Sequence, residues 1–447
     1  MATQKTYGEV EPGSAKWLKS WDVDKIDSDQ NKLAWQTLWV TTFSLTLAFS
    51  TWFLVSAIAP KLQGAGFQLS KEQLYWLTSM PGLSAGILRI IWTFLPPIVG
   101  TRRLVSGSTL LLLIPLTGWY FALQDPSTPF AVLLGLAFLA GLGGANFSGF
   151  MPSTSYFFPK SKQGTVLGIQ AGIGNFGVSL AQLLTPWLIS FGVIGSSLVF
   201  AKKDAEGVLI SSSNVWLHNA PLFYIPLVVI GAALAWFFLK SVPVKATIMQ
   251  QKDIFADKHT YIMTALYMMT FGTFSGYAAQ FGLLIKNQFG VFDNPPDPLK
   301  YAFLGALVGS IARIIGGPLA DKFGGAFITN ISGIGLVASI FVSSTVVMPT
   351  ASDQFTLFLW GSLSLFFFAG LGNASTFKQI PMIFQQRQAG GVIGFTAAIG
   401  AFGPFIGGVA LVLVTPKQFF YVSALFFLIC LILNYWFYLR KSAERHC

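Results

Sequence analysis

Charged residues are scarce in this sequence, and their scarcity excludes an ordinary water-soluble fold. Asp, Glu, Lys and Arg make up 10% of the 447 residues, whereas hydrophobic residues make up 53%. The mean hydropathy is +0.63, and apolar runs of about 18 residues or more, long enough to cross a bilayer as a helix, recur along the chain. This composition is typical of a protein that crosses a membrane several times.

Cysteine and histidine are rarer still, which excludes several kinds of site. The two cysteines, Cys430 in an apolar run and Cys447 at the C-terminus, predict neither a disulfide framework nor a cysteine metal site. His218, His259 and His446 lie at the ends of apolar runs or in the tail, so they form no relay across the membrane. No apolar run contains a metal-spaced cluster or a nucleophile motif. We therefore expect no metal, no cofactor and no enzymatic activity.

The apolar runs predict an all-α, polytopic membrane protein with twelve transmembrane helices. The first 34 residues are polar and lack the pattern of a cleavable signal peptide, so the first run serves as the insertion signal. The expected spans are approximately 35–60, 74–99, 104–123, 130–156, 164–190, 221–239, 260–284, 300–320, 326–348, 355–384, 391–414 and 418–439.

The basic residues predict the orientation of these helices. With twelve spans both termini lie on one side, and the loops and tails of that side hold eighteen Lys and Arg residues against seven on the other side. Because short loops rich in Lys and Arg stay in the cytoplasm, both termini are expected there. The net charge of +11 is then explained by topology rather than by a nucleic-acid partner.

The two halves of the sequence resemble each other at three places, in the same order. The matching pairs are ILRII from Ile87 with IARII from Ile311, AGLGGANF from Ala140 with AGLGNASTF from Ala369, and GIQAGIGNFG from Gly168 with GFTAAIGAFG from Gly394. A parallel duplication is typical of the major facilitator architecture, with a central cavity between its halves. We expect a cytoplasmic tail at 1–34, six-helix halves at 35–239 and 259–439, a cytoplasmic linker at 240–258 and a cytoplasmic tail at 440–447.

Further motifs resemble one family within that superfamily. GGPLADKFGG, from Gly316, is similar to the superfamily's signature loop, and AGLGGANFSGF followed by FFPKSKQGTVLGIQAGIGNFGVSLAQL, from Phe157, is similar to the first glycine-rich signature of the nitrate/nitrite porters. The resemblance extends from about Trp35 to Tyr438. It implies a monomeric carrier of nitrate and nitrite that works by alternating access in the bilayer of the inner (plasma) membrane. One departure is Ala397, where family members often carry a hydroxyl residue.

Arg89 and Arg313 lie in the middle of the second and eighth apolar runs. A charge at mid-membrane depth costs roughly 2.5 to 3.5 kcal/mol on insertion scales, so both arginines are expected to face one protein-lined cavity. A guanidinium is planar, always charged and offers forked donors, which suits flat nitrate or bent nitrite. In the alternative reading, each arginine extends toward the membrane surface or binds carbonyl groups at a helix end.

The resemblance implies that Phe147, Tyr267 and Phe271 line the substrate site. Rings on either side of a planar anion would orient it and exclude water, and the tyrosine hydroxyl would donate a hydrogen bond. Ordinary core packing is the alternative in a chain with 15% aromatic residues. Asn175, a polar residue among glycines, either forms a hydrogen bond across helices or donates to the anion.

Glycines at helical spacing predict close helix contacts in the fifth and eleventh runs. Small faces let helices approach and slide, so these residues are candidate gating glycines, although ordinary packing is the alternative. The set is Gly168, Gly172, Gly174, Gly177, Gly400 and Gly403.

The positions of the acidic residues bear on how transport is coupled. All seventeen Asp and Glu residues lie in tails, loops or span ends, whereas proton-driven carriers commonly bury a residue that titrates. An empty site with uncompensated positive charge should also resist reorientation, so nitrate/nitrite antiport is expected. Lys378 leaves proton symport open, because it is able to form part of the anion site, compensate a helix end or titrate.

Other functions were weighed against a carrier. A channel requires rings of pore residues and a continuous path, whereas duplicated halves around one central charge pair favour a carrier that occludes its substrate. A sensor without transport activity on the same fold and a carrier for another small inorganic anion are the remaining alternatives.

Overall fold

The computed structural model describes residues 9–23, 28–203, 209–243, 249–292 and 294–447. Residues 1–8 and 24–27 of the predicted tail, and 244–248 of the predicted linker, lie outside the described residues.

Each apolar run of the first half is helical. The elements are α1 (Ser28–Leu62), α2 (Lys71–Phe94), α3 (Pro96–Val99), α4 (Thr101–Leu110), α5 (Leu113–Ala122), α6 (Phe130–Ser155), the 3₁₀ turn η1 (Lys160–Lys162), α7 (Gln163–Leu188) and α8 (Asn219–Phe238). The first helix was predicted to begin at about residue 35, but α1 begins at Ser28. The helix continues beyond the apolar run because Ala34 and Leu38 pack against Phe157 and Phe158 at the end of α6.

The second half is helical in the same way. Its elements are the 3₁₀ segment η2 (Met249–Ala256), α9 (Lys258–Tyr267), the π-helical turn η3 (Met268–Gly272), α10 (Thr273–Phe289), α11 (Pro298–Phe323), α12 (Gly325–Val346), α13 (Gln354–Ile383), α14 (Gln386–Gly400), α15 (Gly403–Leu413), α16 (Pro416–Asn434) and the π-helical turn η4 (Tyr435–Leu439).

Ten helical segments of the described chain are long and apolar enough to cross a membrane. The predicted spans 74–99 and 260–284 are helical but are not among the ten. The first corresponds to α2, which carries Lys71, Glu72 and Arg89. The second is divided by the π-helical turn between α9 and α10.

A β-hairpin departs from the all-α prediction. Strands β1 (Leu198–Lys203) and β2 (Leu209–Val215) pair antiparallel between α7 and α8. The hairpin is anchored to the end of α1, because Ala201 N donates to Gly64 O at 2.8 Å and Lys61 Nζ lies 4.8 Å from the centre of the Phe200 ring.

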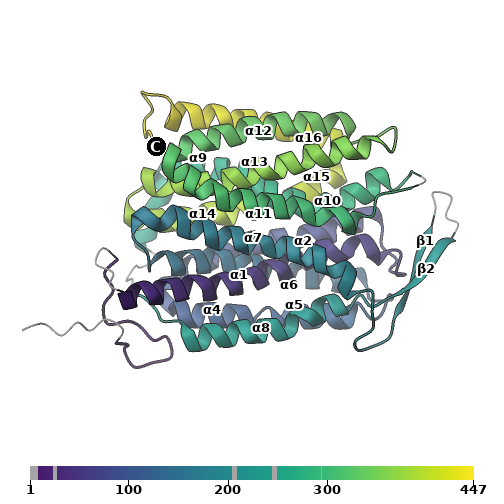
Figure 1. Cartoon of the computed structure of the whole chain (residues 1–447), viewed down its shortest axis with the longest axis horizontal. Helices are drawn as coiled ribbons and strands as arrows, with labels where there is room; N and C mark the ends of the chain where they lie inside the picture. Colours follow the sequence, from purple (N-terminus) through teal and green to yellow (C-terminus); the bar gives the residue numbers. More distant parts are fainter. Residues whose placement is uncertain (1–8, 24–27, 204–208, 244–248, 293) are drawn as a thin grey trace, which may run out of the picture.

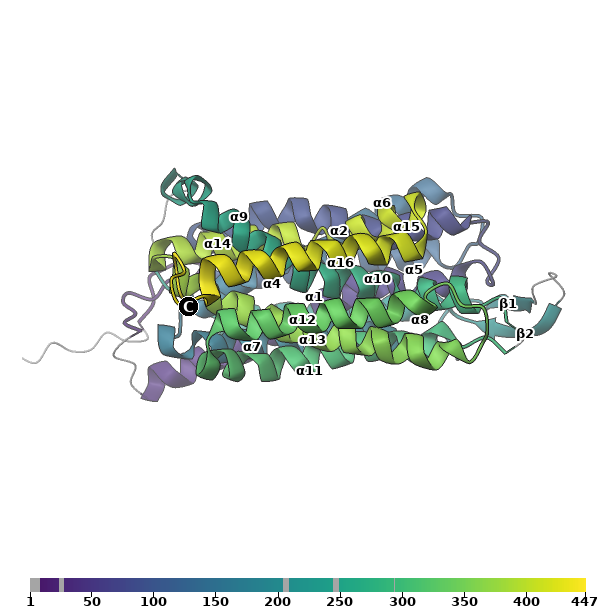
Figure 2. The ribbon, with the colours of Figure 1, turned by 90° about the horizontal axis from the view of Figure 1, so that it is seen from above.

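The helices run nearly parallel to the long axis of the molecule (Figure 1, Figure 2). In Figure 1 most helices of the first half form the lower part of the bundle, and α9 to α16 form the upper part. The start of α1 and the C-terminus lie at one end, which we call the termini end; the hairpin marks the opposite, hairpin end. Four helices of the described first half make the main contacts with the second: α7 packs on α11, α2 on α14 and α15, α1 on α10, and α6 on α14.

Candidate functional site

Arg89 and Arg313 are both buried and lie beside the same aromatic rings. Arg89 on α2 is 0% exposed and Arg313 on α11 is 1% exposed. Arg89 Cζ lies 4.8 Å from the ring centre of Phe147 and 5.2 Å from that of Phe271. The corresponding distances from Arg313 Cζ are 5.6 and 5.8 Å. Both guanidinium groups therefore lie within cation–π range of the same two rings.

Arg89 forms hydrogen bonds with both halves. Its Nε donates to Gly144 O on α6 at 2.7 Å, and its Nη1 donates to Ala397 O on α14, also at 2.7 Å. Because the acceptor at Ala397 is a backbone carbonyl, the missing side-chain hydroxyl at this position does not affect the contact. Arg89 Nη2 has no partner among the described residues.

Arg313 also forms hydrogen bonds with residues of both halves. Its Nη2 donates to the Tyr267 hydroxyl at 3.4 Å. Asn175 on α7 is oriented so that its side-chain oxygen accepts from Arg313 Nη1 at 3.2 Å, while its nitrogen donates to Ala171 O at 3.3 Å. Asn175 thus forms a hydrogen bond across helices. Arg313 Nε has no partner in the described part of the chain.

Neither arginine has a carboxylate partner. Within the described ranges, the ion pairs involve other residues at the two ends of the bundle. Two buried, unpaired cations are unfavourable unless something compensates them. An anion between the guanidinium groups would supply that compensation and would accept from the free N–H donors.

The aromatic residues form a continuous stack beside the arginines. The ring centres of Tyr267 and Phe271 are 5.2 Å apart, with planes at 12°, and those of Phe147 and Phe271 are 6.0 Å apart at 22°. Tyr267 is the last residue of α9 and Phe271 lies in the π-helical turn η3, so an irregular turn determines how these two rings are placed relative to each other. A planar anion between two rings needs a separation of about 7 Å, twice an ordinary carbon contact, so Phe147 and Phe271 must part by about 1 Å to admit one.

Two further aromatic residues of the site were not predicted from the sequence. Phe377 on α13 stacks on Tyr267, with ring centres 4.5 Å apart and planes at 8°, and lies 5.4 Å from Arg313 Cζ. The ring of Trp52 lies 5.2 Å from Arg89 Cζ. The internal repeat carried a signal for Phe377, because AGLGNASTF ends in a phenylalanine one position after the counterpart of Phe147, the last residue of AGLGGANF. Nothing in the sequence around Trp52 indicated its position.

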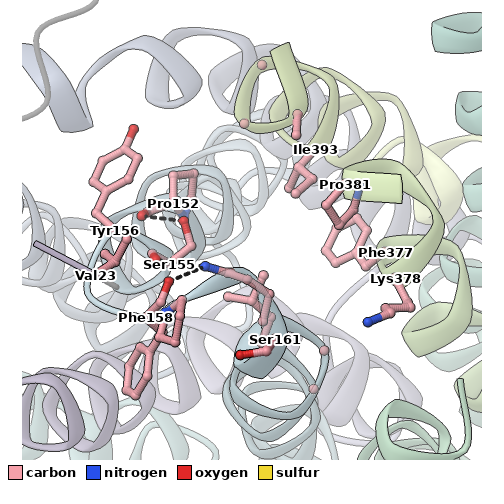
Figure 3. Close-up of a pocket in the computed structure, with 18 of the residues that line it drawn as sticks. Val23, Pro152, Ser155, Tyr156, Phe158, Ser161, Phe377, Lys378, Pro381 and Ile393 are labelled. Atoms are coloured by element: carbon pink, nitrogen blue, oxygen red, sulfur yellow. Dashed lines mark hydrogen bonds between the residues drawn. The ribbon is translucent and has the colours of Figure 1, made fainter. Parts of the chain in front are cut away.

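A cavity of about 890 Å³ extends from the termini end to Arg313, whereas Arg89 does not line it. Arg313 and Phe377 line its deep part, and the ends of α2, α6 and α13 and the starts of α7 and α14 form its walls. Figure 3 shows Tyr156 and Phe158 on one side of the cavity and Phe377, Lys378, Pro381 and Ile393 on the other.

Contacts between the halves close the hairpin end. Gln280 on α10 accepts from Thr78 Oγ1 on α2 at 2.8 Å, and Gln182 Nε2 on α7 donates to Ala278 O at 3.0 Å. Nearer the surface, Lys61 Nζ lies 3.6 Å from a carboxylate oxygen of Asp297. The central site is thus accessible from the termini end and closed toward the hairpin end.

The candidate gating glycines divide into two groups. A Cβ atom at Gly168 would lie 3.7 Å from Gly317 Cα, and one at Gly172 would overlap Ile314, so both glycines face α11 of the other half. The other four face their own half: Gly174 and Gly177 pack against α1, Gly400 packs against Tyr267, and Gly403 packs against Gly272.

Lys378 is ion-paired rather than free. Its Nζ lies 2.6 Å from Asp321 Oδ1, at the termini end of α11. Asp321 Oδ2 also accepts from Thr165 Oγ1 on α7 at 3.3 Å. The Asp321 carboxylate therefore connects α13 with the first half, beside Lys378, which lines the cavity.

Comparison with known proteins adds independent information. A model of the Major Facilitator Superfamily matches residues 39–398. The chain is 55% identical over 441 residues to the probable nitrate/nitrite antiporter NarK2 of Thermus thermophilus, which covers 96% of this chain and 98% of the relative. It is 35% identical to the nitrate/nitrite transporter NarU of Escherichia coli (strain K12), over 97% of this chain and 98% of the relative. It is 27% identical to the nitrite extrusion protein of Bacillus subtilis (strain 168), over 81% and 83%.

Proposed function

Because the chain belongs to the nitrate/nitrite porter family of the major facilitator superfamily, we propose that it is a secondary carrier that exchanges nitrate and nitrite across the inner (plasma) membrane. The family consists of integral membrane transporters rather than enzymes. Relatives named for nitrate and nitrite transport match nearly the full length of the chain, which supports the choice of substrate.

The observation that carries the proposal is the pair of buried arginines without carboxylate partners. Arg89 Nη2 and Arg313 Nε are free donors, and the Tyr267 hydroxyl lies beside them. Nitrate and nitrite offer two or three oxygens in one plane, which match forked donors above flat rings. In this mechanism the anion neutralises the site, and Phe147 and Phe271 hold its plane and exclude water.

The mechanism we propose is alternating access. The cavity at the termini end gives one route to the site, at Arg313, and the contacts of Thr78 and Gln280 close the route from the other end. Rocking of the two halves would close the first route and open the second. With both termini in the cytoplasm, the present arrangement faces inward.

We further propose the membrane arrangement expected from the sequence. All twelve predicted runs cross the membrane, including α2 and the interrupted pair α9 and α10, in two pseudo-symmetric six-helix halves. The cavity and both arginines belong to one chain, which supports transport by a monomer in the bilayer.

Counterflow of labelled nitrate in proteoliposomes tests the proposal. Vesicles loaded with unlabelled nitrate or nitrite should transiently accumulate labelled nitrate, because a carrier exchanges one anion for another. An open channel does not produce counterflow, and a sensor moves no nitrate. Competition by a panel of small inorganic anions in the same assay tests the substrate: an anion that competes far better than nitrate would replace it.

A further inference from the structure

Asn373 on α13 is a fully buried amide without a hydrogen bond. Its side chain is 0% exposed, and neither Nδ2 nor Oδ1 has a partner among the described residues. Burying an unpaired amide is costly, so such a group requires an explanation, of which ligand binding is one. Its place in the molecule indicates that role.

Asn373 borders the deep part of the central cavity, together with Arg313 and Phe377. Asn373 precedes Phe377 by four residues, so both lie on one face of α13. The neighbouring residues of Asn373 pack on the helical turn that follows Arg313: a Cβ atom at Gly316 would lie 3.0 Å from Leu371 O and 3.1 Å from Ala374 Cβ. Asn373 and Arg313 therefore lie on two packed helices and border the same cavity.

The internal repeat shows that the two halves differ at this position. Gly144 is the counterpart of Asn373 when AGLGGANF is matched with AGLGNASTF. In the first half, the Gly144 carbonyl accepts from Arg89 Nε. In the second half, Arg313 Nε has no partner among the described residues, and the counterpart of Gly144 carries an unpaired side-chain amide. At this position the first half therefore supplies a backbone acceptor, whereas the second half has an additional side-chain donor, Asn373 Nδ2.

We propose that Asn373 is a specificity residue that donates from Nδ2 to the third oxygen of nitrate. The inference rests on the proposed function, because it concerns the same anion site. Two oxygens of either anion are bound by the arginines and Tyr267; nitrite has no third oxygen and leaves the amide unpaired. A site built to bond a group rejects the analogue that lacks the group, because its own buried donor is left unsatisfied. Asn373 therefore favours nitrate over nitrite.

The test compares the affinities of the full-length protein for the two anions. Calorimetry with nitrate and with nitrite is performed on the wild type, Asn373→Ala and Asn373→Ser. Each Asn373 variant should bind nitrate about tenfold more weakly, the effect of losing one hydrogen bond to a charged group, and nitrite within about twofold of wild type. Thermal melting checks that each variant is folded. If the alanine variant does not fold, the serine variant is used for the comparison.

Asn146→Ala is the matched control. Asn146 is equally buried in the corresponding segment of the first half, but its Nδ2 donates to Ser108 O at 3.4 Å and it does not line the cavity. Its substitution should leave the ratio of the two affinities unchanged. An equal loss of affinity for both anions, or no loss of affinity for nitrate, in folded Asn373 variants would overturn the role of Asn373. A wild-type protein that binds neither anion would instead overturn the proposed function.

Discussion

Arg89 on α2 donates a hydrogen bond from Nη1 to the carbonyl oxygen of Ala397 on α14, at 2.7 Å. The contact runs from the first half to the second, and Asn175 on α7 accepts from Arg313 on α11 in the reciprocal direction. Each arginine is thereby tied to the half to which it does not belong. In the proposed alternating-access mechanism, movement of the halves would change both contacts and so couple anion binding at the central site to the conformation of the protein.

Replacing either arginine by lysine should weaken nitrate binding although the charge is kept. Arg89→Lys and Arg313→Lys lose the forked donors, and loss of one charge-assisted hydrogen bond costs about 1.5 to 3 kcal/mol, roughly tenfold to a hundredfold in affinity. Calorimetry with nitrate measures the effect. Arg103→Lys, at an exposed position on α4, is the control. Binding within twofold of wild type in either variant would refute the two-arginine site.

Phe377→Leu should weaken nitrate binding by a smaller factor. The substitution removes the stack on Tyr267 and the ring near Arg313 while keeping an apolar side chain. Aromatic pairs contribute about 0.5 to 1.5 kcal/mol beyond their buried area, so affinity should fall roughly twofold to tenfold. Phe367→Leu, on the same helix but 40% exposed, should have no effect. An unchanged affinity in Phe377→Leu would show that this ring is packing alone.

The sequence predicted much of the helical layout and the principal residues of the candidate site. Depth in an apolar run was enough to select Arg89 and Arg313, because burying a charge in a membrane protein requires a special environment. The resemblance supplied Phe147, Tyr267 and Phe271, which the structure brings together with both arginines. The predicted start of the first helix was wrong, because packing against the end of α6 extends α1 beyond its apolar run.

Other features depend on contacts between distant parts of the chain. The partner of Lys378 is Asp321, 57 positions earlier, and no local pattern connects them. The hairpin was missed because its strands are short and are anchored by Gly64 and Lys61, far away in sequence. The glycine pattern was visible, but only packing shows that Gly172 faces the other half and Gly174 faces its own.

Because Gly172 faces the other half and Gly174 faces its own, replacing each of them should have a different effect. Gly172→Leu should block counterflow and leave the protein folded, because the new side chain would meet Ile314 on α11 at the contact between halves. Gly174→Leu should instead lower the thermal stability, since a Cβ atom there would lie 2.7 Å from Leu45 within the first half. Gly135→Ala, with open space around it, is the control. Full counterflow in Gly172→Leu would mean that α7 and α11 do not slide.

Exchange should be obligatory, because reorientation of the empty carrier would move two uncompensated guanidinium groups. Among the described residues, Asp and Glu within long helices lie only near helix ends, as Asp29, Glu72 and Asp321 do, so no central carboxylate is available to carry a proton. Labelled nitrate should therefore enter vesicles that contain nitrite and fail to enter vesicles without a permeant anion. An inward proton gradient should not change this result.

Lys378 is the residue that would carry the proton if the protein were a symporter. Because Lys378 is ion-paired with Asp321, the test must change both residues. Lys378→Met alone leaves Asp321 with an unpaired charge at the cavity wall, so its effect would mix coupling with local repulsion. The double variant Lys378→Met with Asp321→Asn removes both charges and should keep nitrite-dependent uptake, because neither group touches the arginines. If the wild type shows strong gradient-driven uptake into anion-free vesicles and the double variant does not, the carrier is a proton symporter and this pair holds the proton.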